Sequence, residues 1–193
     1  MIRYFKPRRI YEIGSGYSTY LSAQAVRKNV EQDRSYQCEL VAIEPYPNEI
    51  LRGGFLGLCR LIAKQVQDVT LSEFEKLEEN DILFIDSSHV LKIASDVQYE
   101  YLDILPRLNK GVIVHFHDIF LPKEYPKEWV LQLRIFWTEQ YLLQAFLAFN
   151  ESFEILWAGS YMHFKQAAKL ESAFNSYDRN KTLPGSFWMR RTK

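Results

Sequence analysis

The chain carries polar side chains where two apolar segments end. The stretch "GVIVHFHDIFLP", residues 111–122, is apolar until it reaches His115, His117 and Asp118. A second stretch, "DILFIDSSH", ends in a similar way with Asp86. If these stretches are neighbouring parallel strands, their carboxyl ends meet at one edge, where ligands bind in doubly wound sheets. Two carboxylates with nearby imidazoles suit Mg²⁺ or Mn²⁺, with Zn²⁺ or Fe²⁺ as alternatives.

The predicted metal ligands are Asp86, His117 and Asp118, and they can meet only if the chain turns. Side chains alternate along a strand, so His117 shares a face with His115 and not with Asp118. We expect the chain to leave the strand at Asp118, because Pro122 cannot continue the ladder. The Asp86 and Asp118 carboxylates should then lie within about 6 Å of each other and share one ion. His115, inside the strand, is expected to be a buried, hydrogen-bonded core residue.

The aspartates also have structural interpretations. Asp86 could cap a helix that starts near Val90, since "DSSH" offers several capping side chains. Asp118 would be a capping residue if the two carboxylates pointed to opposite faces of the sheet.

The stretch "YEIGSGYST", residues 11–19, lies where the first strand should meet the first helix. Gly14 and Gly16 allow a tight turn and close approach of a ligand, and the helix N-terminus offers free N–H groups. A dinucleotide fingerprint needs a third small residue, but Thr19 stands there, and Glu12 precedes the first glycine. Glu12 would repel a pyrophosphate and could hold the ammonium group of S-adenosylmethionine. The predicted cofactor contacts are Glu12, Gly14, Ser15 and Gly16, and the alternative is a turn with a purely topological role.

Two further acids follow the next two strands. Glu44, in "VAIEPYP", can accept hydrogen bonds from both ribose hydroxyls, or it can be a solvated acid at a strand end. Asp68, in "VQDVTL", could face the adenine amino group, or it can be the cap of a turn. We predict that both contact the cofactor.

Short β-like segments alternate with helical segments along the chain. The expected strands are "RRIYEIG", "CELVAIEP", "RLIAKQVQ", "DILFIDSS", "GVIVHFH", "FEILWAGS" and "GSFWMRR". This alternation predicts a doubly wound α/β fold with a mostly parallel seven-stranded sheet and an antiparallel edge strand. Helices are expected over residues 18–30, 91–108 and, as one long amphipathic helix, 127–150.

Composition bounds the class of protein. A chain of 193 residues with 47% hydrophobic content fits a single domain, residues 1–193. The formal net charge is zero, which disfavours nucleic acid and anionic membranes as partners. Cys38 and Cys59 are too few for a disulfide framework, and the sequence shows neither an export signal nor a membrane span. These features favour a soluble cytoplasmic protein.

Together, "YEIGSGYST", "AIEPYP", "DILFIDSSH" and "GVIVHFHDIFLP" resemble the motifs of class I, Rossmann-like S-adenosylmethionine-dependent methyltransferases. Within this class the chain is similar to methyltransferase family 24 and shares its layout with catechol-type and macrolide-sugar O-methyltransferases. The resemblance assigns Glu12, Gly14 and Gly16 to the methionine end of the cofactor and Glu44 to the ribose. The first strand begins within about ten residues of Met1, so helices that usually precede it are expected to be missing.

The resemblance also bears on the catalytic residues. Asp86 and Asp118 match two carboxylate ligands of metal-dependent O-methyltransferases, while the third ligand position is Ile119, so His117 would have to substitute. His89 stands three residues after Asp86, where catechol-type enzymes carry a lysine base. Asp86 and His89 are therefore the predicted catalytic residues, with His89 as the base. The alternative for His89 is a solvent-exposed histidine at a helix start.

The function that follows is methyl transfer from S-adenosylmethionine to the oxygen of a small hydroxylated acceptor, assisted by a divalent cation. The acceptor can be a sugar, a phenol or a peptide side chain, and a homodimer is compatible with this layout. Two other functions stay open: a metal-dependent oxygenase or hydrolase, because two acids with a histidine resemble a facial metal triad, and a non-catalytic nucleotide-binding or scaffold protein.

Overall fold

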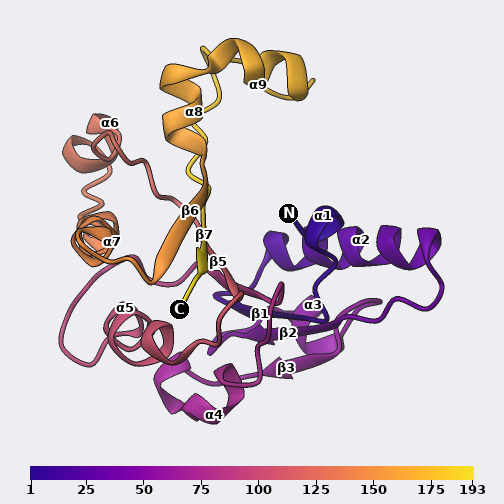
Figure 1. Ribbon diagram of the computed structural model, residues 1–193. Helices are drawn as coiled ribbons and strands as arrows, with labels where there is room; N and C mark the ends of the chain where they lie inside the picture. Colours follow the sequence, from indigo (N-terminus) through magenta and orange to yellow (C-terminus); the bar gives the residue numbers. More distant parts are fainter.

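The computed structural model describes residues 1–193 and contains one seven-stranded sheet (Figure 1). The strand order is β3-β2-β1-β4-β5-β7-β6. The strands are β1 (Arg9–Ile13), β2 (Glu39–Ile43), β3 (Arg60–Ile62), β4 (Ile82–Ile85), β5 (Ile113–Phe116), β6 (Phe153–Ala158) and β7 (Phe187–Arg191). Strands β1 to β5 pair in parallel, and β7 is antiparallel between β5 and the edge strand β6. The predicted mostly parallel, doubly wound sheet is confirmed.

Helices lie on both faces of the sheet, with α1 and α2 on one face and α4 and α5 on the other (Figure 1). The helices are α1 (Ile2–Phe5), α2 (Tyr17–Gln32), α3 (Glu49–Gly53), α4 (Leu71–Phe74), α5 (Asp96–Tyr99), α6 (Lys127–Leu131), α7 (Glu139–Leu147), α8 (Gly159–Lys165) and α9 (Ala167–Ala173). Helices α8 and α9 project beyond the ends of β6 and β7. None of the helices combines the length and the apolar character needed to cross a membrane.

Alternation along the strands divides the apolar side chains between the two faces. Tyr11 and Ile13 of β1 join a large buried cluster, whereas Ile10 joins a smaller cluster with Ala23 and Val26 of α2. Residue 12 follows the alternation of Ile10, so the Glu12 side chain lies on the α2 face, where it is completely buried. The fold therefore buries a carboxylate where most strand positions carry an apolar residue.

The long helix predicted over residues 127–150 is wrong. The segment contains α6 and α7, separated by residues without helical structure and by Arg134, whose φ is +55°. At the start of α7, the Thr138 and Glu139 backbone N–H groups both donate to the His89 carbonyl, at 2.9 and 3.1 Å. Only part of the apolar pattern lies on a helix, because this contact with a distant loop fixes where α7 begins and Phe149, beyond its end, is fully exposed.

The helix predicted over residues 91–108 begins only at Asp96. Its cap is Ser95, whose side chain accepts a hydrogen bond from the Gln98 backbone N–H at 3.2 Å. The interpretation of Asp86 as a cap for a helix near Val90 is therefore wrong. After α5 the chain continues as a π-helical turn, Glu100–Ile104, and a 3₁₀ turn, Leu105–Arg107.

Candidate functional site

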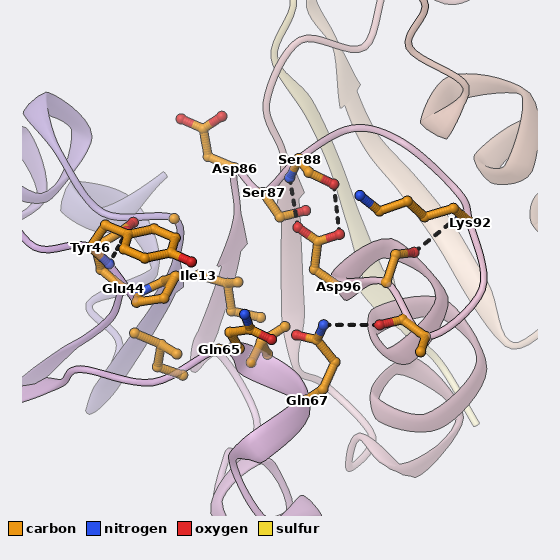
Figure 2. A pocket seen from close by; sticks show the side chains of 16 residues that line it. Ile13, Glu44, Tyr46, Gln65, Gln67, Asp86, Ser87, Ser88, Lys92 and Asp96 are labelled. Atoms are coloured by element: carbon orange, nitrogen blue, oxygen red, sulfur yellow. Dashed lines mark hydrogen bonds between the residues drawn. The ribbon is translucent and has the colours of Figure 1, made fainter.

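A cleft of about 500 Å³ lies at the carboxyl ends of β1, β2 and β4 (Figure 2). Glu44 and Tyr46 come from the loop after β2, Gln65 and Gln67 from the segment after β3, and Asp86 from the end of β4. The cleft thus occupies the position where doubly wound sheets bind ligands.

Gly14 shapes the floor of this cleft. Its φ is +77°, and a Cβ atom built there would lie 1.7 Å from the Asp86 carbonyl oxygen. No residue with a side chain fits this position without displacing β4. Gly16 differs, because a Cβ there would meet no heavy atom within 4 Å. The Gly16 backbone N–H donates to the Thr19 hydroxyl at 3.0 Å, so Thr19 caps the start of α2.

The Glu44 carboxylate joins two loops at the wall of the cleft. One oxygen accepts from the Tyr46 backbone N–H at 2.8 Å, and the other accepts from the Ser15 backbone N–H at 3.2 Å. Ser15 and Glu44 are therefore in contact, but only Glu44 lines the cleft. Glu44 also has a structural role, because it connects the loop after β1 with the loop after β2.

Glu12 does not line the cleft but lies buried behind it, on the α2 face. The Ser18 hydroxyl donates to Oε1, whereas Oε2 has no hydrogen-bond partner. Burial raises the pKa of Glu12 to about 7, and the hydrogen bond from Ser18 only partly opposes this rise. An unpartnered buried carboxylate oxygen is a suitable acceptor for a cationic group.

Asp68 is not brought to the cleft. It is exposed, at the end of the 3₁₀ turn Val66–Asp68, while Gln65 and Gln67 line the cleft instead. The Gln67 amide donates to the Ala94 carbonyl at 3.1 Å. The spacing of these polar residues does not predict which of them faces the cleft, because the 3₁₀ turn determines their directions.

The turn required after β5 is present. The strand ends at Phe116, and Asp118 has a φ of +54°. The neighbouring Ile119 backbone N–H donates to the Gly185 carbonyl at 2.8 Å, which fixes the turn against the segment before β7. Gly185 is tightly packed here, since a Cβ would lie 2.9 Å from the Asp118 Cα. His117 and Asp118 consequently lie at the same edge of the sheet.

The three predicted metal ligands approach one another at this edge. His117 Nδ1 lies 3.2 Å from Asp118 Oδ1 and 3.6 Å from Asp86 Oδ1, but it makes no hydrogen bond. The contact with Asp118 raises the pKa of His117, and burial opposes this rise. No three His, Cys, Asp or Glu side chains are arranged around a single ion position. The donor set is present, whereas a preformed coordination geometry is not.

His89, predicted as the base, is buried and held between two carboxylates. Its Nδ1 lies 2.7 Å from Glu139 Oε2, and its Nε2 lies 3.3 Å from Asp86 Oδ1. The Trp137 ring packs on the imidazole at a centroid distance of 4.2 Å. Burial would lower the pKa of His89, but the contacts with Asp86 and Glu139 outweigh it and raise the pKa to about 10. The alternative of a solvent-exposed histidine is wrong.

Glu139 is the residue of this site that sequence reasoning missed. It is completely buried, and the Tyr101 hydroxyl donates to its Oε1 at 3.2 Å. Burial raises the pKa of Glu139, and the contacts with His89 and Tyr101 oppose this rise. An acid within the apolar run "FWTEQYLL" is the only signal in the sequence, and it does not indicate His89, 50 residues away, as the partner.

The loop after β4 is fixed by two further acids. Asp96 accepts from the Ser88 hydroxyl at 2.6 Å and from the Ser88 backbone N–H at 2.9 Å (Figure 2). Ser87 donates to Glu100 Oε2 at 3.0 Å, and burial raises the pKa of Glu100 well above its usual range. These contacts hold the loop that carries both Asp86 and His89.

His115 is buried, as expected, with 3% of its surface exposed. The expected hydrogen bond of its Nδ1 is absent. Instead, the ring lies between Phe84 and Trp188, with centroid distances of 4.1 and 4.4 Å. Burial lowers the pKa of His115 well below its usual range, so the ring is neutral.

Comparison with known proteins identifies the family. A family model described as a methyltransferase domain matches residues 11–119, which include the glycine-rich turn and the end of β5. The chain belongs to methyltransferase family 24. An uncharacterized protein from Archaeoglobus fulgidus is 48% identical to this family member over 83 residues, which are 42% of the present chain and 36% of that protein. The chain thus matches only about a third of that relative's length.

Two solved structures of CmcI share the fold of this family 24 chain. The D160 form with Mg and SAM is 16% identical with a TM-score of 0.51, and the alignment covers 100% of this chain and 68% of that chain. The N160 form with SAH is 12% identical with a TM-score of 0.52, and the alignment covers 100% of this chain and 73% of that chain. The resemblance to a class I S-adenosylmethionine-dependent methyltransferase, inferred from the sequence motifs, is confirmed at the level of family and fold.

Proposed function

We propose that this chain is an S-adenosylmethionine-dependent O-methyltransferase that acts on a small hydroxylated acceptor with the assistance of a divalent cation. The observation that carries the proposal is the convergence of four side chains at the carboxyl ends of β4 and β5. Asp86 lines the cleft, and His89, His117 and Asp118 lie around it. Titratable groups gathered beside a cleft are a common feature of catalytic sites.

Three features support S-adenosylmethionine as the cofactor. Gly14 gives the floor of the cleft no side chain, and Glu44 offers carboxylate oxygens at its wall. The unpartnered Glu12 Oε2 can accept from an ammonium group, directly or through water. A dinucleotide would instead bring a pyrophosphate close to Glu12. Calorimetry with S-adenosylmethionine, its demethylated product and NAD, with and without Mg²⁺, tests this choice, and tighter binding of NAD would overturn it.

The acceptor hydroxyl must lose its proton and meet the sulfonium methyl in line. We assign His89 Nε2 as the atom that accepts this proton; it lies 3.3 Å from Asp86 Oδ1 at the cleft. With a pKa of about 10, His89 is mostly protonated at neutral pH. Methyl transfer should therefore accelerate as the pH rises toward about 10. A rate that is constant between about pH 7 and 9 would exclude His89 as the base.

The residues at the sheet edge have the chemistry of a divalent-cation site. Asp86 and Asp118 supply hard oxygen donors, and His117 Nδ1, which lacks a hydrogen-bond partner, supplies an imidazole. These three residues would hold the ion, which would lower the pKa of a bound hydroxyl. The chain's own residues position the acceptor oxygen and remove its proton.

The same donor set supports a second candidate function. Two carboxylates and one imidazole also resemble the facial triad of iron-dependent oxygenases. An assay that follows labelled methyl transfer and oxygen consumption in parallel, with Mg²⁺ or Fe²⁺ added, separates the candidates. Oxygen consumption that depends on iron, without methyl transfer, would replace the proposed function, while inactivity with every metal and acceptor would favour a scaffold role.

A further inference from the structure

A second cavity, of about 350 Å³, opens on the α2 face of the sheet. It lies between helices α1 and α2 and strands β4, β5 and β7, and most of its lining is apolar. It shares no lining residue with the cleft described above, but one of its residues, His117, lies beside the Asp86 carboxylate. His117 lines the cavity, and its Nδ1 is 3.6 Å from the Asp86 carboxylate, which lines the cleft.

The sheet wall of this cavity is aromatic. Phe84, His115 and Trp188 stand in register on three adjacent strands. Their rings are in contact, with centroid distances of 4.1 Å for the first pair and 4.4 Å for the second. The Trp188 indole N–H already donates to the Ser186 hydroxyl at 2.7 Å. A ligand that lies against this wall therefore meets the surfaces of aromatic rings but no free indole N–H donor.

Few polar atoms on the sheet wall of the cavity are free, and on its α1 side the exposed Arg3 already donates to Asn29. His115 Nδ1 and His117 Nδ1 are buried and have no hydrogen-bond partner, and their rings lie 6.1 Å apart. The Ser18 hydroxyl, also in the lining, is already engaged with Glu12. A sugar would bury several hydroxyl groups against a wall with few partners, and each unsatisfied group carries a penalty of about 1–3 kcal/mol. A flat ring with one or two hydroxyl groups matches this inventory.

We infer that this cavity binds the methyl acceptor and that the acceptor is a planar aromatic alcohol. The inference rests on the proposed methyltransferase function and names its substrate class. The acceptor ring packs on Phe84 and Trp188, and its hydroxyl group reaches His117 at the border of the cleft. A lone pair of that oxygen then forms the new O–CH₃ bond while the C–S⁺ bond breaks and its electron pair remains on sulfur. The hydroxyl proton leaves to the neutral form of His89, which Asp86 Oδ1 connects to this border, 3.3 Å from His89 Nε2 and 3.6 Å from His117 Nδ1.

The experiment compares catechol with cis-cyclohexane-1,2-diol, which has two hydroxyl groups but no aromatic ring. Binding of each to the full chain saturated with S-adenosylhomocysteine is measured by calorimetry. Because each of the two aromatic contacts contributes about 0.5–1.5 kcal/mol, catechol should bind at least about fivefold more tightly. Equal affinities, or no binding of catechol, would overturn the inference.

Two variants locate the binding. Leu21→Trp fills the rim of the cavity from a side chain that is 72% exposed, so the fold should tolerate it. Phe84→Leu removes one ring of the wall. Each should weaken catechol binding about fivefold to tenfold and leave S-adenosylhomocysteine binding unchanged. Phe174→Leu, at the end of the projecting α9, is the matched control and should change neither affinity.

The outcomes separate this inference from the proposed function. If Leu21→Trp leaves catechol binding unchanged, the acceptor does not use this cavity. If it weakens S-adenosylhomocysteine as much as catechol, the cavity belongs to the methionine end of the cofactor. If catechol binds in the cavity but no methyl group is transferred to it, the cavity assignment stands and the proposed function fails.

Discussion

At the scale of single residues, burial decides what the carboxylates of this protein can do. Glu12 and Glu139 are both completely buried, yet Glu12 has an unpartnered oxygen while Glu139 uses both of its oxygens. Removal from water penalises a charged carboxylate unless a partner compensates. One Glu12 oxygen therefore remains uncompensated, whereas Glu139 already contacts His89.

Replacing Glu44 with Ala should weaken S-adenosylmethionine binding. Hydrogen bonds to a charged group contribute about 1.5–3 kcal/mol each, so the affinity should fall at least about tenfold. Ala also removes the acceptor of the Ser15 and Tyr46 backbone N–H groups, whereas Glu44→Gln keeps one oxygen. Calorimetry on both variants should give an intermediate loss for Gln. An unchanged affinity in the Ala variant would show that Glu44 only connects the two loops.

Asp118→Asn should reduce metal-dependent methyl transfer far more than cofactor binding. The Asp118 carboxylate contacts His117 at the end of β5 and is absent from the lining of the cofactor cleft. Losing its charge weakens a hard cation site but leaves Glu44 and Gly14 in place. Rates with Mn²⁺ and calorimetry with S-adenosylmethionine measure the two effects. Equal losses would place Asp118 in the cofactor pocket.

Glu139→Gln should lower the pKa of His89 from about 10, because it removes one of the two carboxylates that favour the imidazolium. The pKa is raised in the folded protein, so the His89 contribution to stability is complete below about pH 6.5 and is lost as the pH rises toward about 10. Over this window the free energy of unfolding of the wild-type protein should fall more steeply than that of the variant.

NMR titration of the His89 imidazole and urea unfolding across this pH range test the prediction. In the variant, burial still lowers the pKa of His89 and Asp86 alone opposes it, so the pKa should fall below about 10. If His89 titrates identically in both proteins, Glu139 has no role in its protonation.

At the scale of elements, two tight turns assemble the site. The turn after β1 brings Gly14 against the end of β4, and the turn after β5 reorients Asp118 toward His117. The second turn is fixed from outside by Gly185, which precedes β7. An element that is distant in sequence thus determines the direction of a predicted metal ligand.

Gly14→Ala should strongly destabilise the protein, because its Cβ would overlap the Asp86 carbonyl and its φ is positive. An unfavourable φ alone costs on the order of 1–3 kcal/mol, and the overlap with backbone adds to it. Gly16→Ala is the matched control, since its Cβ meets no neighbour and its φ of −176° is extended. Thermal unfolding without ligands should give a clearly lower melting temperature for Gly14→Ala than for Gly16→Ala. Similar melting temperatures would show that the end of β4 can move to accommodate the Cβ atom.

At the scale of the whole molecule, two hollows lie at neighbouring places on the sheet. The cleft lies at the carboxyl ends of β1, β2 and β4, while the aromatic cavity extends from β4 across β5 to β7. Asp86 and His117 lie where the two regions meet. Donor and acceptor can therefore approach from different sides of the sheet edge.

Binding of S-adenosylhomocysteine should stabilise the whole fold, because the cleft is built from segments that separate on unfolding. At a ligand concentration about one hundred times the dissociation constant, the free energy of unfolding should rise by about 2.7 kcal/mol. Thermal unfolding with S-adenosylhomocysteine or NAD at equal concentration measures this effect. A larger shift with NAD would contradict the cofactor assignment.

Much of the architecture could be predicted because it depends on local patterns. Short β-like runs identified all seven strands, and the glycine-rich turn indicated a loop of which Gly14 lines the cleft. Helix boundaries were less predictable. The break between α6 and α7 depends on hydrogen bonds to the His89 carbonyl, and the late start of α5 depends on Ser95. Such contacts can end a helix even where the periodic pattern of apolar residues continues, so the pattern does not predict them.

The sequence by itself determined which residue types stand at the ends of β4 and β5, and hence that Asp86, His89, His117 and Asp118 share one edge. A strand's end is fixed by local pattern, and parallel strands place like ends together. Only the tertiary structure decided how these groups are protonated and oriented. Glu139 reaches His89 across 50 residues, and Gly185 holds the turn at Asp118. Burial and through-space contacts determine these properties, and neither is encoded by spacing along the chain.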